Sequence, residues 1–192
     1  MSHTADYAID GGQFAERCQA FVIITLGESI VVTGATAAEA GLTGSVVLAL
    51  AAAFLVTAGL WWLYFGQVAE HSRRRIAESE DPGRLARDAY TYLHLPIIAG
   101  VIVTAVGDEL LLAHPSHPFS TTGALLMLGG PALFLLGETL FRVRMIGSAN
   151  AKRLTAIAAL AALGLVSGSV SALALTGLVA AVLTLLSVWE YG

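Results

Sequence analysis

The sequence predicts an all-helical membrane protein, a bundle of about six transmembrane helices whose N-terminus lies in the cytoplasm. Of the 192 residues, 56% are hydrophobic and 12% are charged, whereas an average soluble domain has roughly 45–50% and about 25%. The mean hydropathy is +0.76. The ten Lys and Arg residues fall between apolar stretches that are long enough to cross a bilayer, which takes about 20 residues. This composition excludes a disordered chain, a nucleic-acid-binding domain and an ordinary soluble enzyme.

Six apolar runs mark the expected spans of a single membrane domain covering residues 1–192. They lie at about residues 15–34, 45–66, 90–112, 121–143, 150–166 and 170–189. The second run ends in Trp61, Trp62, Tyr64 and Phe65, which we expect at the membrane interface. The fifth run is short and rich in alanine, so a re-entrant hairpin is the alternative there.

The basic residues predict the orientation. Arg17 stands at the entrance of the first span, five Arg lie between the second and third spans, and four Lys or Arg lie at or between the facing ends of the fourth and fifth. Because cytoplasmic loops carry an excess of Lys and Arg, an N-in topology places all ten on the cytoplasmic side. Residues 1–13 lack a basic region before an apolar core, so we expect the first apolar run to act as both targeting signal and anchor.

Glu28 is the clearest candidate for a functional polar residue inside a span. It lies about 13 residues into the first span, roughly 20 Å along a helix axis at 1.5 Å per residue. An ionisable group at that depth is costly and needs a partner, a wet cavity or a proton. Glu28, with Ser29 beside it, is therefore either an ion or proton ligand or a neutral carboxyl group that hydrogen-bonds another helix.

His94 and Asp108 lie two heptads apart in the third span, so a helix places them on nearly one face. That face is a candidate polar path across the membrane. The alternatives are an interfacial histidine beside the basic loop and an aspartate solvated at the outer boundary.

The fourth span contains Gly129, Gly130 and Pro131, and we expect them to interrupt its helix. Broken helices in transporters expose half-helix ends that hold ions and substrates. Glu138 follows, with Arg142 four residues later, a spacing that predicts an ion pair within the helix.

No motif predicts catalysis, a metal or a cofactor, and we expect the protein not to be an enzyme. Cys18 is the only cysteine, and His114 and His117 supply only two ligands in a Pro-rich turn. The expected partners are the lipid bilayer and either a second copy or a partner membrane protein, without nucleic acid. The five Arg of the loop after the second span are suited to anionic headgroups.

Four segments resemble the bacterial low temperature requirement A (LtrA) family. They are residues 14–17 (FAER), 21–29 (FVIITLGES), 92–96 (YLHLP) and 136–142 (LGETLFR). The chain is similar to the C-terminal part of family members, which are usually about twice as long. It departs from the family pattern at Gln13, where a His is usual, and at residues 18–20 (CQA), where Phe-Gly-Leu is usual.

The family name implies a growth requirement at low temperature and no particular biochemical activity. The resemblance implies a multi-pass protein of the bacterial cell (inner) membrane. Within the matching segments we expect Glu16, Arg17 and Arg142 at the cytoplasmic interface.

Glu28, Ser29, His94, Asp108 and Glu138 are the candidate ion-binding, proton-binding or polar-path residues. The expected function is an ion- or proton-coupled transporter or channel component that supports growth at low temperature. The alternative is a structural or accessory membrane protein that assembles with a partner or with anionic lipid.

Overall fold

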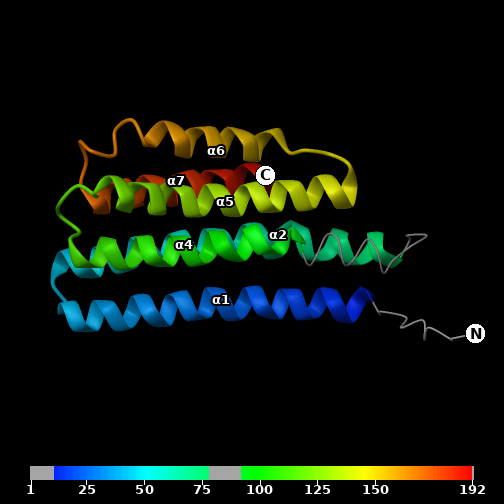
Figure 1. Ribbon diagram of the computed structural model, residues 1–192, viewed down its shortest axis with the longest axis horizontal. Helices are drawn as coiled ribbons and strands as arrows, with labels where there is room; N and C mark the ends of the chain where they lie inside the picture. The colour runs from blue at the N-terminus through cyan, green and yellow to red at the C-terminus, as the bar shows by residue number, and fades with distance from the viewer. Residues whose placement is uncertain (1–10, 78–91, 192) are drawn as a thin grey trace, which may run out of the picture.

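The computed structural model describes residues 11–77 and 92–191, and within them it contains helices and no strand (Figure 1). The helices are α1 (Gly11–Ala40), α2 (Gly44–Ala77), α4 (His94–Ala113), α5 (Thr121–Ile146), α6 (Ala151–Leu163) and α7 (Ala172–Tyr191). Five of them, all except α6, are long and apolar enough to cross a membrane. The predicted all-helical membrane bundle is confirmed.

The helices lie side by side with their long axes nearly parallel, with α1 at one edge of the bundle and α6 at the opposite edge (Figure 1). At one end α1 and α4 begin, and α2, α5 and α7 end. Every Lys and Arg of the described residues lies toward this end, which we call the basic end: Arg17, Arg73, Arg74, Arg75, Arg142, Arg144, Lys152 and Arg153. Arg84, Arg87 and the first two residues of the expected third span (90 and 91) lie outside the described residues.

The segment from α5 to α7 crosses the whole bundle although α6 is short. Asn150, before α6, hydrogen-bonds Glu190 near the end of α7. The N–H of Ala172, at the start of α7, donates to the His117 carbonyl oxygen at the other end of the bundle, at 2.8 Å. Thirteen residues of this segment form α6, about 20 Å at 1.5 Å per residue, and turns at residues 164–169 carry the chain onward. The weak fifth apolar run is therefore a short helix followed by turns.

The closest helix pair in the bundle is α4 with α5, and glycines bring the two backbones together. A Cβ atom on Gly100 would lie 2.5 Å from the Phe134 nitrogen and 2.8 Å from the Gly130 carbonyl oxygen. A Cβ atom on Gly130 would lie 2.6 Å from the Thr104 nitrogen. Small residues allow this approach, which increases dispersion contacts where lipid supplies no hydrophobic driving force.

The helix break expected at Gly129, Gly130 and Pro131 is not found. α5 is one helix from Thr121 to Ile146 with Pro131 inside it. Proline removes a single N–H donor, and neighbouring helices often hold a membrane helix together around it. Here α4 packs directly against Gly130, so the tight contact supports the helix at the position where the sequence pattern predicts an interruption.

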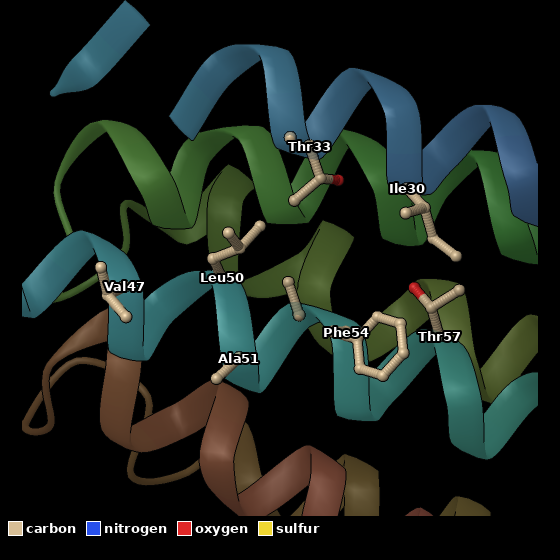
Figure 2. Close-up of a pocket in the computed structure, with 9 residues that line it drawn as sticks. Ile30, Thr33, Val47, Leu50, Ala51, Phe54 and Thr57 are labelled. Carbon is tan, nitrogen blue, oxygen red and sulfur yellow. The ribbon is translucent and has the colours of Figure 1, made fainter. Parts of the chain in front are cut away.

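α1 is the least enclosed of the five long helices. Only 28% of its most apolar stretch is buried, against 61% for α5. α1 contacts α2 and α4, and an apolar groove of about 440 Å³ runs between α1 and α2. Figure 2 shows Ile30 and Thr33 of α1 facing Leu50, Phe54 and Thr57 of α2 across this groove. The Thr33 hydroxyl donates to the Ser29 carbonyl oxygen at 2.6 Å, so it adds little polarity to the groove.

We predict that Gly130→Ala destabilises the bundle by about 1–3 kcal/mol, because the added methyl group forces α4 and α5 apart. Gly129→Ala is the matched control, since a Cβ atom at Gly129 meets nothing within 4 Å. A denaturation titration in detergent micelles, followed by circular dichroism, measures both variants. Equal stability of the two variants would contradict the close α4–α5 contact.

Candidate functional site

A buried ion-pair network centred on Arg153 joins three helices at the basic end. The guanidinium Nη1 of Arg153 lies 2.8 Å from a carboxylate oxygen of Glu138 on α5. Its Nε and Nη2 donate to the two carboxylate oxygens of Glu190 on α7, at 2.9 and 3.0 Å. The side chains of Arg153 and Glu138 are 0% exposed, and that of Glu190 is 1% exposed. A planar guanidinium suits this bidentate contact with a carboxylate.

The start of α6 positions Arg153. Asn150 caps the helix, because its side-chain oxygen accepts the N–H of Lys152 at 3.0 Å. The Asn150 side-chain amide also donates to Glu190, and the Lys152 ammonium donates to the carbonyl oxygen of Trp189. These two contacts and the Arg153–Glu190 ion pair hold the first turn of α6 against the end of α7.

A second polar contact lies between α2 and α4. The hydroxyl of Tyr64 and Nε2 of His94 share a hydrogen bond of 2.8 Å, and both side chains are buried. The His94 ring meets Phe141 of α5 edge-on, with ring centroids 5.0 Å apart. Tyr64 was expected at the membrane interface with Trp61 and Trp62; those two are about half exposed, whereas Tyr64 is in the core.

The two contacts are neighbours in the fold. Arg153 Nη2 lies 3.5 Å from the carbonyl oxygen of Leu63, the residue before Tyr64. Glu138 and Phe141 lie one turn apart on α5, so they share a helix face. We call Tyr64, His94, Glu138, Arg153 and Glu190 together the inner polar cluster.

Asp108 lies apart from the inner polar cluster, toward the other end of α4. It is 1% exposed, and neither of its carboxylate oxygens has a hydrogen-bond partner among the described residues. The hydroxyl of Thr104, one turn away, donates to the Gly100 carbonyl oxygen at 2.8 Å instead. His94 and Asp108 both lie in the buried part of α4, with the buried apolar side chains of Ile97 and Val101 between them.

The structure does not bring Glu28 to this cluster. Glu28 is exposed near the middle of α1, and its neighbour Gly27 is exposed too. Ser29 is buried, and its hydroxyl donates to the Leu26 carbonyl oxygen at 2.8 Å. Glu16 and Arg17 are exposed in the first part of α1, toward the basic end.

Arg153 and Glu190 are the site residues that the sequence reasoning missed. The structure gives Glu138 an ion pair with Arg153 of the next helix, and Arg142, the partner that the spacing within α5 predicts, also acts on Glu138 electrostatically. Arg142 is half-buried nearby. The only sequence signal was the position of Arg153 inside the first turn of an apolar run, which was interpreted as a cytoplasmic flank.

The described residues contain no group of three or more His, Cys, Asp or Glu side chains that could hold a metal ion. His114 and His117 are exposed in the turn after α4, with ring centroids 6.4 Å apart.

The long apolar helices and the charged groups buried between them define a helical membrane protein. The sequence profile of the family described as "Bacterial low temperature requirement A protein (LtrA)" matches residues 1–188, and the chain belongs to this family.

A relative from Rhizobium meliloti (strain 1021), named "Uncharacterized protein RA0937", is 34% identical over 183 residues. The match covers 95% of this chain and 45% of that protein, so the chain spans just under half the length of this relative. No solved structure matches the chain.

We predict that Arg153→Met destabilises the protein by about 3–5 kcal/mol, because it leaves two buried carboxylates without their common counter-ion. Arg144→Met is the control, since Arg144 is exposed at the same end, and we expect it to cost at most about 1 kcal/mol. Denaturation in detergent micelles, followed by circular dichroism, compares the two. A loss for Arg153→Met no larger than that for Arg144→Met would contradict the network.

Proposed function

We propose that the protein is a proton-coupled transporter, or a membrane component of one, in which Asp108 is the proton-binding group. The observation that carries this proposal is the burial of both Asp108 carboxylate oxygens without a hydrogen-bond partner among the described residues. The proposed role is not enzymatic.

The energetics of burial support a protonation site at Asp108. A charged carboxylate inside a bilayer-spanning bundle costs several kcal/mol unless a cation, a proton or donors compensate for it. The described Lys and Arg residues all lie toward the basic end, whereas Asp108 lies toward the opposite end of α4. A bound proton is therefore the simplest compensation, and loading and release of that proton would link Asp108 to the conformation around it.

The inner polar cluster contains a second candidate proton-binding group, His94, for a proton pathway across the membrane. Histidine is the side chain whose ordinary titration falls nearest to neutral pH, and His94 lies 14 residues before Asp108 on the same helix, about 21 Å along the axis. In our proposal the two groups take up protons at different depths. A conformational change that admits water along Ile97 and Val101 would connect them.

The proposal includes a multi-pass orientation in the bacterial inner membrane, with the basic end in the cytoplasm. Support comes from the described Lys and Arg residues, which share one end of the bundle, as the positive-inside rule expects. The family description supports a contribution to growth at low temperature.

The proposal also includes self-association through the exposed face of α1. A carboxyl group facing lipid near the middle of a span is unfavourable, and Glu28 is exposed there. In a dimer with its two-fold axis along the membrane normal, identical residues lie at equal depth. The two Glu28 carboxyl groups can then hydrogen-bond each other.

We predict that Asp108→Asn lowers proton flux by about tenfold or more, because the amide cannot take up and release the proton. The measurement uses liposomes that contain the purified protein and a pH-sensitive dye, with a potassium gradient and valinomycin as the driving force. Glu109→Gln is the matched control, since Glu109 is the next residue along the helix and is exposed, and its flux should equal that of the wild type.

Equal flux in wild type, Asp108→Asn and protein-free liposomes would overturn the transport proposal in favour of the accessory role. Normal growth at low temperature of cells that carry Asp108→Asn would contradict the proposed role of Asp108.

We predict that Glu28→Leu converts a dimer in mild detergent to a monomer, because it removes the central hydrogen-bonded pair. Size-exclusion chromatography with light scattering measures the mass. Ile24→Leu is the control, because Ile24 lies one turn earlier on the same face and is 64% exposed; it should remain dimeric. A monomeric wild type, or a dimeric Glu28→Leu variant, would contradict this arrangement.

A further inference from the structure

A polar cavity opens at the basic end, beside the Arg153 network but outside it. Its volume is about 280 Å³, and its polar lining comes from Arg142 at the end of α5, Asn150 and Lys152 at the start of α6, and Glu190 at the end of α7. The groove between α1 and α2 has an apolar lining. The two hollows therefore suit different chemistry, and this one suits a charged ligand.

The charge around the cavity is positive. The acidic side chain that lines it, Glu190, already accepts hydrogen bonds from Arg153 and Asn150. Arg153, 2.9 Å from Glu190, also pairs with Glu138, so these three buried groups together carry one net negative charge. Arg142 and Lys152 add two positive charges, which leaves one net positive charge among the side chains at this end of α5, α6 and α7. A ligand that enters this cavity meets two cationic side chains from two different helices.

The cavity lies at the depth of lipid headgroups. The Lys152 ammonium is 5.4 Å from the centre of the Trp189 ring, and Trp189 is 54% exposed. Tryptophan gathers at the membrane–water interface, where its apolar ring and its N–H group are both accommodated. An interfacial Trp beside an interfacial Lys places the mouth of the cavity next to phospholipid phosphates.

We infer that this cavity binds the phosphate group of an anionic phospholipid from the leaflet at the basic end, through Arg142 and Lys152. Arg contacts phosphate oxygens in a bidentate fashion, and Lys acts as a point charge on them. The same chemistry would accept soluble phosphate, so the test separates the two sources. The inference uses neither Asp108 nor transport activity, and it can fail or succeed independently of them.

The test is a titration of the purified full chain in dodecyl maltoside with dioleoyl phosphatidylglycerol, with dioleoyl phosphatidylcholine and with inorganic phosphate. A ligand that binds only the folded state raises the thermal unfolding midpoint, which circular dichroism records. We expect phosphatidylglycerol to raise the midpoint at lower concentration than phosphatidylcholine, whose choline group offsets the phosphate charge.

In the double variant Arg142→Gln, Lys152→Gln we expect the half-saturating phosphatidylglycerol concentration to rise by about tenfold, from the loss of two charged contacts. Arg144→Gln is the control: it removes one positive charge from the same end but does not line the cavity, and its titration should match the wild type. If the double variant does not fold, the single variant Lys152→Gln should still weaken the response by about threefold.

An unchanged phosphatidylglycerol titration in the folded variants would overturn the site. So would a loss in Arg144→Gln as large as that in the double variant, because it would indicate a diffuse surface charge. Protection by inorganic phosphate at the same concentration as phosphatidylglycerol, lost in the double variant, would support the site and assign it to a soluble phosphate.

Discussion

One guanidinium group inside the bundle determines how its last three helices fit together. Arg153 lies on α6 and contacts Glu138 on α5 and Glu190 on α7. A shift of α6 relative to either α5 or α7 would therefore break an ion pair. In a low-dielectric interior a lone charge is expensive, and each charge of this network has an opposite charge beside it, while Glu138 Oε1 has no hydrogen-bond partner among the described residues. The network explains how the short helix α6 keeps a fixed place at the edge of the bundle, where apolar contacts alone leave it free to slide. The Nη2 of Arg153 also lies 3.5 Å from the carbonyl oxygen of Leu63, beside the hydrogen-bonded pair of Tyr64 and His94.

In the middle of the bundle, close packing of small residues holds the helices together in place of ion pairs. Gly100 and Gly130 let the backbones of α4 and α5 touch, and the hydroxyl of Thr104 is turned back onto its own helix. The result is a dense, apolar contact between an inner polar cluster near one end and Asp108 near the other. The buried ionisable groups of the described residues therefore lie at two depths, which separates the two buried titratable groups of α4, His94 and Asp108.

The features visible in the sequence were those set by local composition. Hydropathy predicted the helices, and the short alanine-rich run predicted the weakness of α6. The spacing of His94 and Asp108 predicted that both lie on one face of α4. What sequence could not supply was the pairing between helices: Arg142 stands four residues from Glu138 in the chain, whereas Arg153 reaches it only because α6 folds back beside α5. The sequence predicted the depth of Glu28 in the membrane but not whether its side chain faces the bundle or the outside. α1 has no apolar stripe that distinguishes one of its faces from the others. The helix break predicted at Pro131 was wrong for the same reason, because α4, which packs against this part of α5, is distant from it in the sequence.

The unequal enclosure of the helices has a mechanical consequence. The contact between α4 and α5 and the ion pairs of α6 and α7 make those four helices one stiff block. α1 contacts this block through α4, and an apolar groove of about 440 Å³ separates it from α2. Because α1 is the least enclosed long helix, we expect a change in bilayer thickness to act first on the groove between α1 and α2.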